Sequence, residues 1–189
     1  MSTYERTMDI TTASKVLHQW HKHGRHVFTR GDLARLFSED TPKALNLGLA
    51  RLIDKGLLKR ACRGVYVNPL VAGDNANTLE HIALAMRRGE YNYLSLESML
   101  SEYGIISQIP LDRLTIMTTG RRGVYRTPGG VIEVTHTARP VDESLASTVR
   151  SETRPLRLAT AGTAWRDLKR VGRNLDLVNR EVLEHECQS

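Results

Sequence analysis

The chain has little cysteine, few aromatic residues and no long apolar run. Its 189 residues include only Cys62 and Cys187, which are far apart and have no metal-ligand pattern beside them. This argues against a cysteine-based metal site and favours two reduced thiols, although a single disulfide also fits. Aromatic residues make up 5%, so a core must be built mainly from Leu, Val, Ile and Ala.

No apolar segment approaches the roughly 20 residues that a membrane-spanning helix needs. The N-terminal stretch Met1–Thr12 is polar and mixed in charge, unlike a secretory signal. We therefore expect a soluble, cytoplasmic protein with no membrane partner.

Positive charge is present in excess and is unevenly distributed. The formal net charge is +6, and residues 1–75 hold 12 Lys/Arg against 7 Asp/Glu, whereas residues 76–189 hold 15 against 14. Between Thr41 and Asn68 there are six basic residues and a single acid, Asp54. A local basic excess of this kind favours a polyanionic partner, although it also promotes solubility.

The basic segment predicts a helix, a turn, a second helix and a hairpin. Thr29 is placed to cap the first helix with Asp32 as its capping-box partner, and Thr41-Pro42 to begin the second. Strand-like residues 57–62 and 65–67 flank Arg63-Gly64, a tight-turn pair. This order is typical of a winged helix-turn-helix, which presents one helix to the DNA major groove and a loop to the phosphates.

One face of the second helix is apolar and is expected to pack inward, through Leu45, Gly48, Leu49, Leu52 and Ile53. The opposite face and the hairpin supply the expected DNA contacts: Thr41, Lys43, Asn46, Leu47, Arg51, Lys59, Arg60 and Arg63. Asn46 can pair bidentately with adenine, and Lys43 or Arg51 can contact guanine or phosphate. Two alternatives remain open, because winged helices also bind proteins and basic faces are often only solvated.

The sequence predicts an α+β chain with three parts: a winged helix-turn-helix domain (1–70), a linker (71–78) and a second, mixed α/β domain (79–189). Before the winged helix core, Thr11 or Thr12 can cap a first helix. In the second domain, three strand-like segments at 114–118, 124–127 and 131–135 predict a small antiparallel sheet. Helices beginning near Thr78 and Ser95, and two more covering 161–168 and 175–183, are expected to flank it.

Two further clusters, one of arginines and one of histidines, do not predict a nucleotide-binding or metal site. Arg121, Arg122 and Arg126 lie around the predicted hairpin, in a loop that lacks the P-loop spacing. They are interpreted either as a solvated turn or as an auxiliary contact to DNA or to a toxin. The histidines at 18, 21, 23 and 26 lack acidic or cysteine partners, so an exposed helix end explains them better than a metal site. We expect no catalytic residue, no metal and no cofactor.

Several segments together resemble the AbiEi antitoxins. They are the hairpin end Arg63–Tyr66 and, in the second domain, the runs Tyr93–Ile105, Leu114–Arg121 and Tyr125–Glu133. The resemblance covers about residues 10–170. It departs at residues 159–164, where relatives often carry a Pro-Glu-Lys-Ala helix start and this chain has Ala-Thr-Ala-Gly-Thr-Ala.

The resemblance implies an antitoxin of a type IV toxin–antitoxin system, of the kind associated with abortive infection and phage defence. Its winged helix would bind inverted repeats in its own promoter and repress the operon. The second domain would oppose a nucleotidyltransferase-like toxin, with a stable complex left open. The protein would be a monomer in solution that binds DNA cooperatively.

Two other functions remain as alternatives. The second domain could modify the toxin enzymatically, as an atypical kinase, although no nucleotide-binding motif is present. Alternatively, the whole protein could be a winged-helix transcription factor whose second domain senses a ligand. We favour the non-enzymatic antitoxin.

Overall fold

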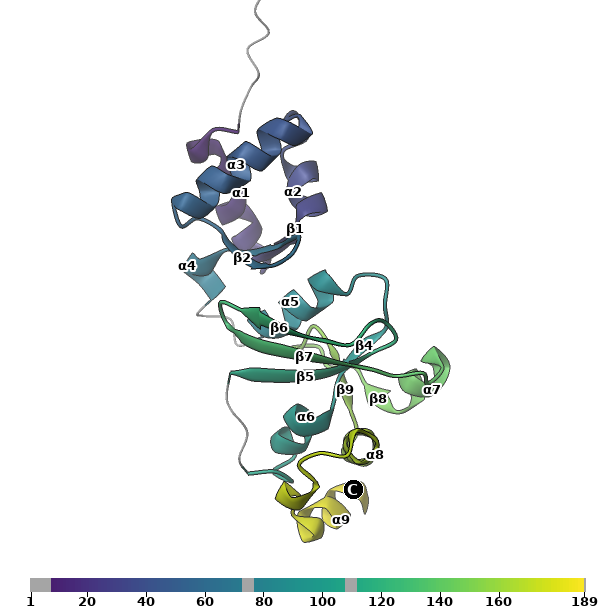
Figure 1. The fold of residues 1–189 in the computed structure, drawn as a ribbon. Helices are drawn as coiled ribbons and strands as arrows, with labels where there is room; N and C mark the ends of the chain where they lie inside the picture. Colours follow the sequence, from purple (N-terminus) through teal and green to yellow (C-terminus); the bar gives the residue numbers. More distant parts are fainter. Residues whose placement is uncertain (1–7, 73–76, 108–111, 189) are drawn as a thin grey trace, which may run out of the picture. The chain divides into compact units, whose positions relative to one another are not determined.

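The computed structural model describes residues 8–72, 77–107 and 112–188 and shows a mixed α+β fold (Figure 1). The chain divides into two compact units, Met1–Thr78 and Leu79–Ser189. No helix within the described ranges is long and apolar enough to cross a membrane.

Unit 1 combines three main helices with a three-stranded sheet. Its elements are α1 (Ile10–Lys22), β1 (Val27–Thr29), α2 (Arg30–Leu36), α3 (Pro42–Asp54), β2 (Lys59–Cys62), β3 (Val65–Val67) and the short α4 (Pro69–Ala72). The sheet is antiparallel in the order β1-β3-β2. Apolar side chains from all three helices meet in one core that includes Leu17, Phe28, Leu33, Leu49 and Leu52. The helix, turn, helix and hairpin predicted from the sequence are all present.

Local capping explains where α2 and α3 begin. The Thr29 hydroxyl accepts the Asp32 backbone N–H at 3.0 Å, and the Asp32 carboxylate accepts the Thr29 N–H at 2.8 Å, which completes the predicted capping box. Thr41 accepts the Ala44 N–H at 3.2 Å, directly before Pro42. The hairpin turns at Gly64, whose φ of +76° is readily accessible only to glycine.

Unit 1 corrects two expectations and adds detail to the rest. The cap of α1 is Asp9, not Thr11 or Thr12, because its carboxylate accepts the Thr12 N–H at 2.9 Å. Ile53 is 39% exposed and does not join the core. Strand β1 was not predicted, since three residues are too few to show a period. The expected linker, 71–78, overlaps α4 at its start and α5 at its end, and residues 73–76 lie outside the described ranges.

Unit 2 is built on one six-stranded sheet. Its strands are β4 (Asn92–Leu94), β5 (Arg113–Thr118), β6 (Gly123–Thr127), β7 (Gly130–His136), β8 (Thr148–Val149) and β9 (Arg157–Ala159), in the order β6-β7-β5-β4-β9-β8. Its helices are α5 (Thr78–Met86), α6 (Leu96–Glu102), α7 (Val141–Ala146), α8 (Ala161–Val171) and α9 (Arg180–Gln188), with a 3-10 turn η1 (Leu175–Leu177). Helix α5 covers one face of the sheet, and α6 and α8 cover the other (Figure 1).

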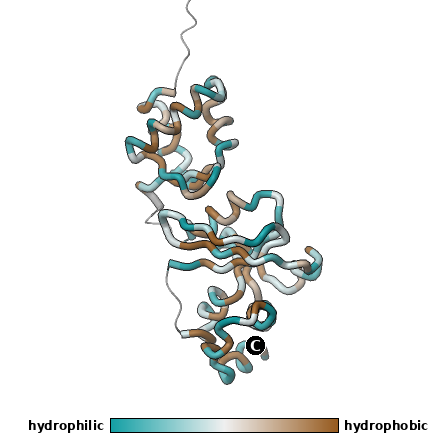
Figure 2. The backbone as a smooth tube through the Cα atoms, in the orientation of Figure 1, coloured by the Kyte–Doolittle hydropathy of each residue, from teal (hydrophilic) through white to brown (hydrophobic). Residues whose placement is uncertain are grey.

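The sheet of unit 2 is larger and less regular than the small antiparallel sheet that we expected. The β6–β7 hairpin is antiparallel as predicted, but β5 pairs with β7 and β4 with β9 in parallel. The long strands β5 and β7 carry the apolar residues that the prediction used (Figure 2). Strands β4, β8 and β9 have two or three residues each and α7 six, so none has a clear sequence period. The predicted last helix is divided into η1 and α9.

Candidate nucleic-acid interface

Helix α3 has one buried face and one exposed face. Its buried residues are Ala44, Leu45, Gly48, Leu49 and Leu52. The exposed side holds Lys43, Asn46, Leu47 and Ala50, which we call the α3 face, and Leu47 is 54% exposed there. A helix of 3.6 residues per turn places these four positions together, away from the core. The α3 face is therefore exposed on the surface of unit 1.

Arg51 lies at the edge of the α3 face. About 100° per residue puts it roughly 140° around the helix from Asn46. Its guanidinium donates a hydrogen bond to the Met8 carbonyl at 3.2 Å, so part of its hydrogen-bonding capacity is used within unit 1. Thr41 also has an internal role, as the cap of α3. Both side chains are exposed, but each supports the domain as well.

The β2–β3 hairpin carries the remaining predicted cations. Lys59, Arg60 and Arg63 are exposed, and the Arg60 guanidinium donates to the Cys62 carbonyl at 3.3 Å. The side chains of Lys59 and Arg63, like that of Lys43 on α3, make no hydrogen bond or ion pair with any described residue. These three charges are therefore available to an external anion.

Two other cations of unit 1, Arg25 and Arg35, lie beside the Asp32 carboxylate. Arg25 forms an ion pair with Asp32 at 2.7 Å and stacks over the Trp20 ring, 5.4 Å from its centroid. Arg35 lies 3.9 Å from the same carboxylate. Lys43, Lys59 and Arg63 are thus exposed cations on α3 and the hairpin, and α1 carries two more, Lys15 and Lys22.

Arg30 joins the α3 face to the hairpin, and the sequence did not point to it. Its backbone N–H donates to the Gly64 carbonyl at 2.8 Å, at the hairpin turn. Its side chain donates twice to Asn46 Oδ1, from Nε at 3.3 Å and from Nη2 at 3.0 Å. Arg30 and Asn46 are sixteen positions apart in the sequence. The sequence around Arg30, which directly follows the α2 cap, does not indicate a partner in the next helix.

The arginines of unit 2 lie on and beside an edge strand. Arg121, Arg122 and Arg126 are all exposed, and none of their side chains has a hydrogen-bond or ion-pair partner among the described residues. On β6, the Tyr125 hydroxyl accepts a hydrogen bond at 2.6 Å from Arg87, the residue directly after α5. Because side chains alternate along a strand, Arg126 points to the other face of the sheet. The sheet thus presents exposed positive charge at its β6 edge.

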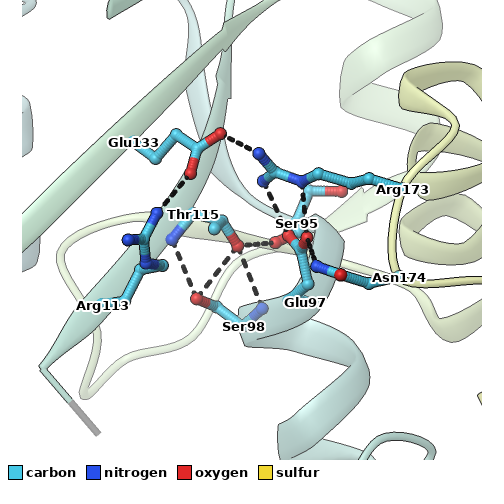
Figure 3. A network of polar contacts seen from close by, with 8 residues as sticks. All are labelled: Ser95, Glu97, Ser98, Arg113, Thr115, Glu133, Arg173 and Asn174. Atoms are coloured by element: carbon cyan, nitrogen blue, oxygen red, sulfur yellow. Dashed lines mark hydrogen bonds and ion pairs between the residues drawn. The ribbon is translucent and has the colours of Figure 1, made fainter. Parts of the chain in front are cut away.

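A network of ion pairs around two buried carboxylates, Glu97 and Glu133, joins the C-terminal segment of unit 2 to α6 and the sheet (Figure 3). Arg173 donates hydrogen bonds to the Glu97 carboxylate of α6 from Nε at 2.6 Å and from Nη2 at 3.0 Å. Its Nη1 donates a hydrogen bond to the Glu133 carboxylate of β7. Asn174 donates to Glu97 at 2.9 Å, and Arg113 of β5 to Glu133 at 2.8 Å. Burial alone would raise the pKa of Glu97, but the hydrogen bonds from Arg173 and Asn174 outweigh it and lower that pKa.

A second buried carboxylate, Asp167 of α8, lies beside this network. It accepts hydrogen bonds from the Tyr93 and Ser95 hydroxyls at 3.0 and 2.9 Å and from Arg139 at 3.2 Å. Burial and the negative charge of Asp167 raise the pKa of Tyr93 far above its ordinary value. Both hydroxyls are committed to holding Asp167, which fits a structural role.

Metal ligands are not gathered at any one point of the described chain. No group of three or more His, Cys, Asp or Glu side chains that could hold a metal occurs within residues 8–72, 77–107 and 112–188. His18 and His21 lie on one side of α1 with ring centroids 6.4 Å apart. The expected exposed helix end does not include all four histidines, because His26 lies beyond α1 and is buried, at 2% exposed.

Comparison with known proteins finds one family model that matches part of unit 1, and its description names a transcriptional regulator. More narrowly, residues 19–69 match the family model described as "Transcriptional regulator, AbiEi antitoxin". This confirms the expected resemblance over the segment that holds α2, α3 and the hairpin, and it supports an antitoxin and regulator role. No curated protein matches the chain.

A solved structure shares the fold. The crystal structure of the RV2827C protein from Mycobacterium tuberculosis matches with a TM-score of 0.57 and 16% sequence identity, over 98% of this chain and 74% of that one. At this identity the likeness concerns the fold alone.

Proposed function

We propose that this chain is a type IV antitoxin that also represses its own operon, by binding promoter DNA through a winged helix-turn-helix in unit 1. The observation that carries the proposal is the set of free cations Lys43, Lys59 and Arg63, displayed on α3 and the hairpin within the segment that matches the regulator family. The order of helices and strands in unit 1 supports the winged-helix assignment.

In this proposal the α3 face enters the major groove and the hairpin lies along the adjacent backbone. Lys59 and Arg63 neutralise phosphates and position the protein, whereas side chains of α3 contact base edges. Inverted repeats in the promoter give each protomer one half-site, and two protomers bind them cooperatively. Leu47 is placed to contact a thymine methyl group.

The antitoxin role belongs to the whole chain, and its functional partner is a nucleotidyltransferase-like toxin. We propose that unit 2 opposes this toxin without chemistry of its own. The commitment of the Tyr93 and Ser95 hydroxyls and of Glu97 and Glu133 to internal hydrogen bonds supports this view. Arg121, Arg122 and Arg126 are candidates for an auxiliary contact with DNA or with the toxin.

The two roles can be tested in one strain. Cells carry a reporter behind this gene's promoter and an inducible copy of the adjacent gene, with wild type, Lys43→Ala/Arg63→Ala, or the matched control Lys15→Ala/Lys22→Ala, which removes two exposed lysines from α1. We expect wild type and the control to repress the reporter and restore growth, and the Lys43/Arg63 variant to restore growth but not repression. Full repression by that variant, or no rescue of growth by wild type, would overturn the respective half of the proposal.

A further inference from the structure

We infer that Arg30 and Asn46 act as one recognition element, and that this element selects guanine rather than adenine at the base pair facing it. The inference rests on the proposed function, because it requires the α3 face to lie in the major groove. It changes the expectation that Asn46 alone pairs with adenine, and it adds Arg30 to the residues that determine sequence specificity.

The geometry leaves no ambiguity about the orientation of the Asn46 amide. An arginine side chain carries only hydrogen-bond donors, so the atom that faces Arg30 must be the carbonyl oxygen Oδ1. That oxygen accepts from both Nε and Nη2, at 3.3 and 3.0 Å. A carbonyl oxygen has two lone pairs, and here both are occupied. The amide nitrogen of Asn46 therefore points away from Arg30.

The paired side chains can offer only donors to DNA. Asn46 keeps the two N–H groups of its amide, and Arg30 keeps three of its five N–H groups. No acceptor remains on either side chain. A free asparagine recognises adenine by accepting from N6 and donating to N7, and the first of these contacts needs the oxygen that Arg30 occupies. Guanine presents two acceptors, O6 and N7, which match a donor-only element.

The element is also held in place before DNA arrives. The Arg30 backbone N–H is fixed to the Gly64 carbonyl at the hairpin turn, and its guanidinium is fixed to Asn46. Both side chains are exposed, so a base edge can reach them. Because the arginine is already ordered, less conformational entropy is lost on binding than for a free side chain.

The experiment is a selection from a library of random duplexes with the full-length wild type, followed by binding titrations on four duplexes that differ only at the selected base pair. The variants are Arg30→Ala, Asn46→Ala and the matched control Arg35→Ala, which removes an exposed arginine from the same helix. Thermal unfolding of each variant confirms that it folds.

We expect the wild type and the Arg35→Ala control to prefer guanine over adenine by about fivefold to 100-fold, the range of one good bidentate contact. Arg30→Ala releases Asn46 Oδ1, so the preference at the same base pair changes to adenine. Asn46→Ala weakens the guanine preference without gaining adenine, because Arg30 alone still offers only donors.

A wild type that selects adenine, or an Arg30→Ala variant with an unchanged preference, would overturn the inference while leaving DNA binding intact. A wild type that binds no duplex at low salt would instead overturn the proposed function, so the two failures are distinguishable.

Discussion

Replacement of Glu97 by Gln tests whether the ion network of Figure 3 stabilises unit 2. Gln has the same shape but no charge, so Arg173 loses a buried carboxylate that it contacts through two nitrogens. The Glu97 side chain is only 6% exposed, whereas that of Arg173 is 34% exposed and keeps its contact with Glu133. The loss of stability is therefore substantial, but water can hydrate the exposed part of the Arg173 guanidinium and reduce it.

The expected cost is about 2 kcal/mol. Hydrogen bonds to charged groups contribute about 1.5–3 kcal/mol each, and the exposure of Arg173 places the loss in the lower part of that range. For a domain of this size, about 2 kcal/mol corresponds to a fall of roughly 8 °C in the unfolding temperature. Scanning calorimetry of the full chain measures this fall directly.

Glu102→Gln is the matched control, because it makes the same substitution on the same helix, α6, at a side chain that is 40% exposed and paired with Arg154. We expect it to cost about 0.5 kcal/mol or less. If Glu97→Gln is no more destabilising than Glu102→Gln, the network does not hold the C-terminal segment in the way that the contacts imply.

The same variant has a distinct pH dependence. Because the folded state lowers the pKa of Glu97, its contribution is fully present above the unfolded pKa of about 4.3 and is lost as the pH falls through the folded value. The gap in stability between wild type and Glu97→Gln should therefore narrow below about pH 4. A gap that widens in acid would show that the charge of Glu97 is not stabilising.

Three further outcomes follow from the contacts. Gly130→Ala should destabilise unit 2 by about 3 kcal/mol or more in urea unfolding, because its φ is +137° and an added Cβ would lie 2.2 Å from a backbone oxygen. The control Gly129→Ala should cost under about 1 kcal/mol, and equal costs for the two variants would contradict the prediction. The folded state raises the pKa of Tyr93, so its contribution to stability is present below the unfolded pKa of about 10 and is lost as the pH rises through the folded value. The free energy of unfolding of Tyr93→Phe should therefore fall less steeply with pH in strong alkali than that of wild type. Identical pH profiles of the two proteins would refute the shift. Lys59→Ala with Arg63→Ala should reduce the slope of log affinity against log salt by about 1.8, because each phosphate contact contributes about 0.9, and an unchanged slope would remove the hairpin from the interface.

The sequence predicted those features of unit 1 that depend on near neighbours. The Thr29–Asp32 capping box and the Thr41 cap each join residues three apart, so the residue types alone indicate them. The turn at Gly64 is likewise a two-residue signal. The cap of α1 was misplaced because Asp9 competes with two threonines at neighbouring positions, and a carboxylate is at least as good a cap.

Features that depend on distant pairing could not be predicted in this way. The parallel pairing of β4 with β9 joins Tyr93 to Arg157, and neither strand is long enough to show a period. Ile53 lies close to the apolar stripe of α3, so the sequence pattern alone does not show that it is exposed. Its exposure depends on which elements pack against the helix. The contact between Arg30 and Asn46 changes the chemistry of the α3 face, and it arises only when two helices are packed together.

Fluorescence anisotropy of a labelled promoter duplex tests the central claim most directly. Full-length wild type, the Lys43→Ala/Arg63→Ala variant and the Lys15→Ala/Lys22→Ala control are titrated at one fixed salt concentration. Each pair removes two exposed charges from unit 1, one from α3 and the hairpin, the other from α1. We predict that the first variant binds about tenfold more weakly than wild type or worse, and that the control binds within about twofold of wild type. Equal losses in the two variants would mean that α3 and the hairpin are not the DNA-binding surface.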